Sequence, residues 1–504
     1  MRKLKHAMTG ILLLCTGMLG CDDFLTVDIP DQLLKKDYWK SRDQLDAALN
    51  GVYVGLGSCI TRYIRWGDFR SHLYTENGNT ADADRRLIRH DIVTTNSNAD
   101  WSQSYMGINY ANSFLANAEE VLKHDFSVTP EEVTSMKGEV YALRALHYFY
   151  LVRAFQDVPV WKEPYESDAQ PTTAPALPMD EVLDFIEEDL KIALRDAPEE
   201  FVSPEEHYGR ITKNAVKALW ADVKLWRGGD DNYRSCIALC EELEEVYTNR
   251  MVDAESWFSI FSVGNSGESI FEYQYLDSRY SSNALFTLFY NTDPNYIGYV
   301  LDVRKAYPSR GNFITTDTVR MQRTIGAHHL YGVLFPYIMK QLAISAENAV
   351  YVMRDGEGRA KLNFIFYRFR EVLLMKAEAL AMLEEYEEAL KPVNTIRRAT
   401  GLPEAIPAEF GSGELFLDKL ICERTAELGY EGKQWFTLVR IALNSGYHTL
   451  LVDRIASTSM DINELVLKGR LTDPRGWFLP YYRDEVQNRN RELKQKEFYK
   501  SKEA

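Results

Sequence analysis

Apolar residues recur at helical spacing soon after the first forty residues. Behind Ser41, the positions i, i+3, i+4, i+7 and i+11 are occupied by Leu45, Ala48, Leu49, Val52 and Leu56. These side chains share one face of a helix, and a serine in front of such a stripe can accept a hydrogen bond from the first turn. A second stripe begins at Trp101 and continues to Leu115. The pattern predicts two amphipathic helices.

Residues 139–155 are apolar nearly all round, which predicts a helix that is buried on every side. Asp157 and Pro159 follow directly and end this helix, because proline cannot continue one. The next helix is expected to open at Pro178 and to stop at Pro198.

Two helix pairs are similar to each other. The first spans residues 209–243 and breaks at Gly228, and the second spans residues 370–402 and turns near Glu384. Small Ala377 lets the partner helix approach, as in a tetratricopeptide-type hairpin. We therefore expect an all-α dominated fold in which helix pairs stack into a superhelix.

The pattern changes over residues 257–367. Alternating runs such as residues 269–275 predict short strands, and Pro, Gly, Asn and Tyr become frequent without helical stripes. Long irregular segments inside a compact domain usually have a function. We place the ligand region in this loop-rich insert.

Two groups of residues are candidates for ligand contact, because aromatic faces stack on sugar rings while hydroxyl and amide groups bond their edges. The insert supplies one group, and residues 65–79, which lack helical periodicity, supply the other. The candidates are Tyr280, Tyr290, Tyr296 and Tyr299, and then Trp66, Arg70, Tyr74 and Asn77. Most of the tyrosines are expected in a local core, with one or two lining a groove. Residues 65–79 suit a surface loop equally well.

The N-terminus has the parts of an export signal in order. Basic Arg2, Lys3 and Lys5 precede an apolar run over residues 8–19, which is too short to span a bilayer. Residues 18–21 look like a lipobox, so Cys21 is the expected lipidation site. The expected organisation is a signal peptide (1–20), a lipidated tether (21–40), an N-terminal helical half (41–255) and a C-terminal half (256–504) that contains the insert 257–367.

Charge and cysteine usage exclude several classes of protein. The formal net charge is −16 and no basic block is present, which argues against nucleic acid and against a basic membrane-binding face. The membrane is thus expected to be reached through the lipid alone. Cys236 and Cys240 share a helical stripe and suit core packing. The pairing of Cys59 and Cys422 cannot be deduced from the sequence.

Catalytic motifs are missing from the sequence. It contains no G-x-S-x-G, H-E-x-x-H, Walker loop or G-x-G-x-x-G after a strand, and its cysteines and histidines have no metal-ligand spacing. The missing motifs favour a protein that is not an enzyme and that has no cofactor, while the question of whether a loop binds a metal ion stays open. His147 is expected to be a core histidine. An Asp/Glu pair of a glycosidase stays open, because carboxylate separation in space decides it.

Several segments together resemble the SusD/RagB family of surface lipoproteins from Bacteroidetes. The resemblance begins at Cys21-Asp22-Asp23-Phe24-Leu25 and continues through residues 142–160 and 210–228. Its most specific parts are residues 368–402 and 423–440. The resemblance implies a tetratricopeptide-like helical frame that serves as the lid of a SusC-like TonB-dependent transporter. It also implies lipid anchorage at the outer membrane, and the acidic residues after Cys21 favour display on the cell exterior.

The expected function is glycan binding for nutrient uptake. The alternative is a peptide-binding lid of the same kind of complex, since members of the family use both ligand classes. A surface glycoside hydrolase and a purely structural assembly protein are weaker alternatives. The identity of the glycan or peptide does not follow from the sequence.

Overall fold

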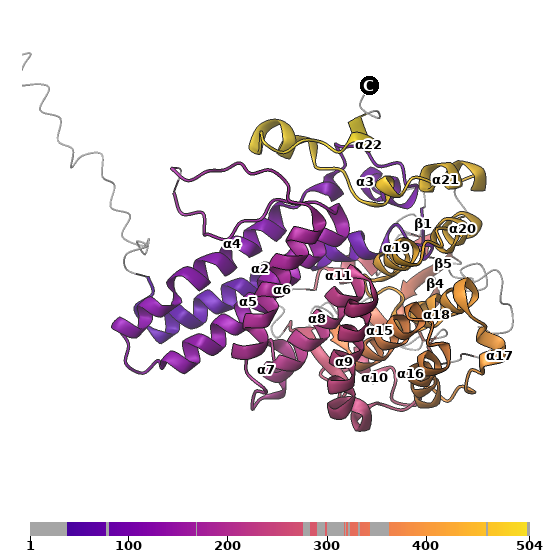
Figure 1. Cartoon of the computed structure of the whole chain (residues 1–504), viewed down its shortest axis with the longest axis horizontal. Helices are drawn as coiled ribbons and strands as arrows, with labels where there is room; N and C mark the ends of the chain where they lie inside the picture. Colours follow the sequence, from indigo (N-terminus) through magenta and orange to yellow (C-terminus); the bar gives the residue numbers. More distant parts are fainter. Residues whose placement is uncertain are drawn as a thin grey trace, which may run out of the picture.

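Helices make up most of the computed structural model. It describes residues 38–76, 80–167, 169–275, 283–289, 298–299, 317, 319–320, 323–330, 333–342, 362–459 and 462–500. Successive helices pack side by side across the molecule, from the indigo N-terminal helices to the orange and yellow C-terminal ones (Figure 1). The predicted helix-dominated fold is confirmed.

Four long helices form the N-terminal part: α2 (Arg42–Asp68), α4 (Ser102–Asn117), α5 (Pro130–Phe155) and α6 (Met179–Asp196). Ser41 caps α2 as predicted, because its side chain accepts a hydrogen bond from the Gln44 N–H. The predicted buried helix is α5, whose residues from Gly138 to Phe155 are nearly all buried. It begins earlier than expected because Thr129 and Glu132 form a capping box.

The two predicted helix pairs are present. They are α8 (Lys213–Arg227) with α9 (Asp230–Tyr247), and α15 (Phe369–Met382) with α16 (Tyr386–Ala399). Helix α9 packs on α15, so the two pairs stack on each other. The turn of the second pair places Glu384 at a φ of 63°, a left-handed conformation that is uncommon for a residue with a side chain.

Shorter helices complete the frame. In the N-terminal half these are α3 (Asp82–Ile88), η3 (Ser97–Ala99), η4 (Ala118–Lys123), α7 (Pro204–Gly209) and η5 (Thr248–Arg250). The described parts of the insert contain α10 (Ser259–Ser262), α11 (Leu285–Phe289) and α13 (Met339–Leu342). Beyond α16 follow α17 (Pro407–Phe410), α18 (Gly413–Leu428), α19 (Gln434–Ser445), α20 (Thr449–Thr458), α21 (Glu464–Leu471), η7 (Pro474–Trp477), the π-helical turn η8 (Glu485–Arg489) and α22 (Glu497–Lys500).

The described strands form three antiparallel pairs. β2 (Ser269–Tyr273) pairs with β6 (Phe364–Arg368), and β4 (Ile325–Leu330) pairs with β5 (Val333–Ile338). The short β1 (Tyr74–Thr75) pairs with β3 (Gly298–Tyr299). The strand predicted from residues 269–275 is therefore confirmed as β2.

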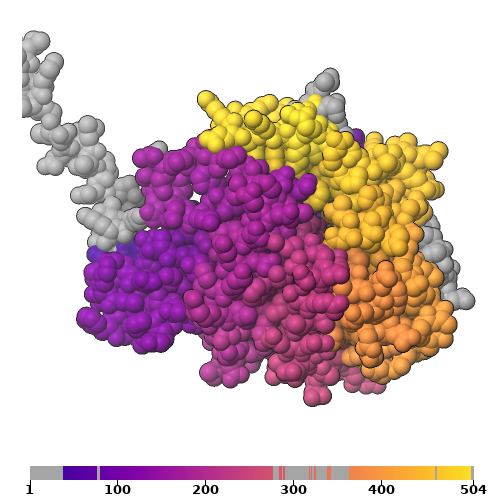
Figure 2. Space-filling model, viewed as in Figure 1, coloured from indigo at the N-terminus to yellow at the C-terminus, as the bar shows by residue number. Residues whose placement is uncertain are grey.

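Helices from the N-terminal and C-terminal parts of the described chain meet in space. Helix α19 packs on α2, and the Asp68 carboxylate accepts hydrogen bonds from the backbone N–H groups of Gly432 and Gln434, at 2.9 and 3.0 Å. Figure 2 shows the yellow C-terminal segment lying directly against the purple surface of the N-terminal part. Among the described residues, none of the helices is both long enough and apolar enough to cross a membrane.

Candidate functional site

The segment over residues 65–79 differs from its prediction. Its first part is the last turn of α2 and not a loop, and Trp66 and Arg70 are buried in the core. The Trp66 indole N–H donates to the Asn98 carbonyl at 2.7 Å, and the Arg70 guanidinium donates to the Gly476 carbonyl at 2.7 Å. Because these side chains face the interior, the structure gives them a role in holding the fold and does not place them on a groove.

Tyr74 is also buried, with 5% of its side chain exposed. In the β1–β3 pair it lies opposite Tyr299, so the two predicted ligand segments do meet in space. Only the backbone of Tyr299 is described. The other predicted residues, Cys21, Asn77, Tyr280, Tyr290 and Tyr296, lie outside the described residues, and their roles stay predictions.

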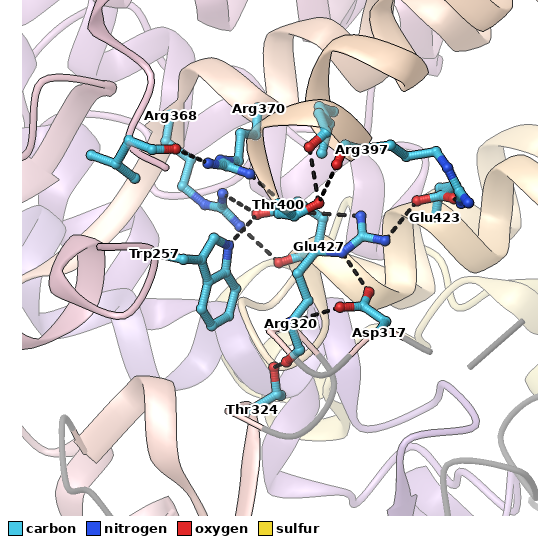
Figure 3. Close-up of polar contacts among 12 residues, drawn as sticks. Trp257, Asp317, Arg320, Thr324, Arg368, Arg370, Arg397, Thr400, Glu423 and Glu427 are labelled. Atoms are coloured by element: carbon cyan, nitrogen blue, oxygen red, sulfur yellow. Dashed lines mark hydrogen bonds and ion pairs between the residues drawn. The ribbon is translucent and has the colours of Figure 1, made fainter. Parts of the chain in front are cut away.

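The described base of the insert is a network of buried charges (Figure 3). The guanidinium groups of Arg320, Arg368 and Arg370 gather around Glu427, with the Trp257 indole beside them. Arg368 donates to Glu427 at 2.6 Å, and the Trp257 N–H donates to the same carboxylate at 3.2 Å. Arg320 belongs to the insert and Glu427 to α18, so the network fastens the insert to the helical frame.

Further ion pairs extend this network. Arg370 pairs with Glu268 at 2.9 Å, and Arg368 also pairs with Glu431 at 2.9 Å. Every one of these side chains is at most 2% exposed. A charge buried to this degree needs a partner, since removing either member of a pair leaves the other charge without compensation.

The protonation states follow from the same surroundings. Burial opposes the charge of Glu431, but the neighbouring Arg368 and Lys340 outweigh it and lower the pKa of Glu431 to about 2. The pKa of Glu427 is lowered further below its usual range for the same reasons. Both carboxylates are therefore ionised at neutral pH and serve as fixed counter-ions, with no proton to give to a substrate.

Histidine and cysteine side chains that could be reactive are also buried in the core. Burial lowers the pKa of His147 to about 3, and its Nδ1 lies 2.7 Å from the Tyr63 hydroxyl. His147 is therefore a neutral core histidine, as predicted. Cys236 and Cys240 are buried and free, which confirms their packing role, and Cys59 and Cys422 are free as well. Within the described ranges, no group of three His, Cys, Asp or Glu side chains could hold a metal ion.

A surface groove lies on the N-terminal part of α4. Its volume is about 660 Å³, and it is lined by α4, by the connection between α5 and α6, and by η8. Such a volume is in the usual range of small-ligand sites. The sequence does not predict this groove, because its walls come from residues 101–112, 159–172 and 485–490, which only the fold brings together. The one local signal was Trp161 and Tyr165 in a proline-rich segment outside any helical stripe.

Two family models match this chain. The model described as "SusD family" matches residues 337–502, and the model described as "Starch-binding associating with outer membrane" matches residues 23–225. The two matches lie at opposite ends of the chain and leave the middle region between them. The chain belongs to the SusD family.

Curated relatives of this SusD-family chain match over most of their length. It is 24% identical to SusD-like protein P38 of Formosa agariphila over 482 residues, which cover 87% of this chain and 92% of that protein. It is 25% identical to SusD-like protein P2 of the same organism over 495 residues, which cover 88% and 91%. The chain is thus similar to these proteins over most of its length.

Solved structures show the same SusD fold. A SusD superfamily protein of Bacteroides fragilis matches with a TM-score of 0.71 at 20% identity, over 92% of this chain and all of that one. A structure named as a laminarin-binding SusD-like protein matches with a TM-score of 0.67 at 19% identity, over 91% of this chain and all of that one. These likenesses confirm the tetratricopeptide-like helical architecture.

Proposed function

We propose that this SusD-family chain is an outer-membrane lipoprotein that binds glycans on the cell exterior and acts as the lid of a SusC-like TonB-dependent transporter. The family membership carries the proposal. One matching model is described as starch-binding, and one solved neighbour is named as laminarin-binding. Starch and laminarin are both uncharged glucans, so an uncharged glycan is the first ligand class to test.

The role of a lid rests on the N-terminal anchor. Residues 1–20 have the pattern of a lipoprotein signal, and Cys21 is the residue to which lipid would be attached. The tether over residues 21–40 would connect the lipid to α2, which begins at Arg42. A lipid with a flexible tether holds a protein at the membrane and still allows it to rotate, as a lid over a transporter must.

The buried charge network is consistent with a protein that binds glycans without cleaving them. Among the described residues, Glu427 and Glu431 have strongly lowered pKa values, and both are enclosed by arginine and lysine side chains. A glycosidase needs one carboxylic acid with a raised pKa beside a second carboxylate, with both facing the sugar. Burial raises the pKa of Glu268 in the same network, but Glu268, Glu427 and Glu431 are all closed to solvent, so none of them can face a sugar. The described part of the insert base therefore supports a structural role for its charges.

Calorimetric titration of the mature chain, residues 21–504, against a panel of oligosaccharides tests the proposal. We expect saturable binding of at least one uncharged glycan with no change in its chain length. Tight binding of peptides with no glycan binding would replace the proposal by the peptide-binding alternative. Cleavage of the bound glycan would show an enzyme. In cells, Cys21→Ala should release a folded protein from the membrane fraction, and continued membrane attachment would contradict the anchor.

A further inference from the structure

The connection between α5 and α6 is an unusual loop. It carries five prolines between residues 159 and 178, which restrict the backbone, and it extends away from the helices beside α4 (Figure 1). Val158 and Leu177 form a backbone bridge that closes its base. The prolines and the bridge together limit the conformations that the loop backbone can adopt.

Two helices hold the first half of the loop. The Tyr148 hydroxyl of α5 donates to the Trp161 carbonyl at 3.1 Å and accepts from the N–H of the same residue at 2.8 Å, and α4 supplies further neutral hydrogen bonds. The Asn112 amide donates to the carbonyls of Trp161 and Glu163 at 3.0 and 3.2 Å, and the Asn109 side chain accepts from the Tyr165 N–H at 2.7 Å. Tyr105 donates to the Pro159 carbonyl at 2.7 Å. These contacts engage the loop backbone and do not involve the Trp161 ring.

The C-terminal segment holds the second half of the loop. The Asn490 side chain bonds both backbone groups of Ala174, donating to its carbonyl at 2.7 Å and accepting from its N–H at 3.2 Å. Thr173 donates to Glu492 at 2.9 Å. The groove therefore has three walls that are fixed to one another before any ligand arrives, which reduces the entropy lost on binding.

Aromatic side chains line this groove at different depths. Trp101 is buried at its base, Tyr105 and Trp161 are partly exposed, and 44% of the Tyr165 side chain is exposed. Rings that are partly exposed on a fixed backbone provide flat apolar surfaces on which the C–H faces of a sugar can stack.

The polar lining is almost neutral. Among the described residues of the groove, Lys162, Glu163 and Glu485 carry charge, and the remaining polar groups are amides and hydroxyls such as Gln170 and Thr172. An anionic ligand would find one cation against two carboxylates, on a chain whose net charge is −16. The charge balance therefore favours an uncharged ligand with many hydroxyl groups.

We propose that this groove, between α4, residues 159–172 and η8, is a binding site for an uncharged oligosaccharide that stacks on Trp161 and Tyr165. The site is separate from the insert over residues 257–367, in which the main ligand region was predicted. The choice of ligand class rests on the proposed function, whereas the location rests on the geometry of the groove alone.

Calorimetric titration of the mature chain with laminarin and with a panel of uncharged oligosaccharides tests the site. Trp161→Ala should weaken binding by up to about tenfold, which corresponds to about 1.4 kcal/mol for the loss of a stacked ring. Trp161→Phe should keep most of the affinity, and Tyr165→Ala should weaken it several-fold. Phe126→Ala is the matched control, because its ring is 91% exposed and it lies beyond the C-terminal end of α4.

The outcomes separate the two proposals. If the wild-type chain binds a glycan and both alanine variants bind it with unchanged affinity, the groove is not the binding site, and the proposed function still stands. Absence of glycan binding by the wild-type chain would overturn both. Because Trp161 and Tyr165 are held through their backbones, the variants should unfold at the wild-type denaturant concentration. An anionic oligosaccharide that binds more tightly than its uncharged analogue, and whose binding is lost in Trp161→Ala, would also overturn the ligand class.

Discussion

Two irregular parts of this protein are fastened to the helical frame by different chemistry. The base of the insert is held by Arg320, Arg368 and Arg370 around Glu427, in ion pairs that are hidden from solvent. The loop between α5 and α6 is held by amide and hydroxyl groups such as Asn112. Buried ion pairs fail when one member is lost, whereas neutral hydrogen bonds can be removed one at a time at a small cost.

The difference separates structural residues from residues that can meet a ligand. Side chains of the charge network are at most a few per cent exposed and have no free face. The side chains that hold the loop, such as Asn112 and Asn490, bond its backbone and leave its aromatic rings at the surface. Substitutions that remove contacts of the charge network should therefore cost more stability than substitutions that remove contacts of the loop.

Removal of the central charge should have the largest effect. Glu427→Gln leaves three buried arginines with one fewer counter-ion and should lower the free energy of unfolding by about 3–5 kcal/mol, measured by urea denaturation. Glu388→Gln is the control, because its exposed pair with Lys391 should contribute about 0.5 kcal/mol or less. A loss below about 1 kcal/mol in Glu427→Gln would show that the network is not essential.

Acid should give the second-largest loss of stability, through the charges at the base of the insert. Burial opposes the charge of Glu431, but Arg368 and Lys340 lower its pKa to about 2, below that of the unfolded chain. Between about pH 4.5 and 2 the unfolded chain therefore binds more protons, and stability falls by up to about 1.4 kcal/mol per pH unit for such a group. Glu431→Gln should make this slope shallower. An identical slope in the variant and the wild-type chain would contradict the assignment.

The neutral fastening of the loop should give a smaller loss. Asn112→Ala removes two hydrogen bonds to the loop backbone and one from Arg144, and should cost about 1–3 kcal/mol. Limited proteolysis should then cut within residues 159–172. Gln103→Ala on the same helix changes an exposed amide that does not line the groove, and should leave the loop resistant. Equal cleavage of both variants would show that Asn112 does not hold the loop in place.

The smallest effect is expected from the internal turn of the loop. The Gln170 side chain accepts from the backbone N–H groups of Glu166 and Ser167 and donates to the Pro164 carbonyl. Gln170→Ala should cost less than about 1 kcal/mol, because the site is partly exposed to water. Amide exchange of residues 166–167 should become faster, while residues held by Asn490 stay protected. Unchanged exchange at residues 166–167 would show that Gln170 does not hold the turn.

The sequence predicted those helices whose apolar residues form a stripe, as in α2 and α15. It failed at the end of α2, where Arg65 and Asp68 look like a break in the stripe. They belong to the helix because Asp84 pairs with Arg65, while backbone N–H groups near the start of α19 bind Asp68. A polar residue with a distant partner cannot be told from a solvated one by its spacing.

The sites were less predictable than the helices. The burial of Glu427 and Arg368 could not be predicted from the sequence, because charged residues are normally exposed and the partners of these two lie far along the chain. The groove joins segments more than 300 residues apart, such as Trp161 and Glu485. The local pattern pointed to the tyrosines of the insert and not to Trp161 or Tyr165, because only the fold brings the walls of the groove together.

Hydrogen–deuterium exchange of the mature chain, with and without a saturating uncharged oligosaccharide, tests the central claim most directly. The account predicts that the ligand protects residues 159–172 and the start of α4, and leaves α18 around Glu427 unchanged. Protection confined to α18, or no protection in residues 159–172 while the ligand is bound, would contradict the separation of ligand contacts from the buried charge network.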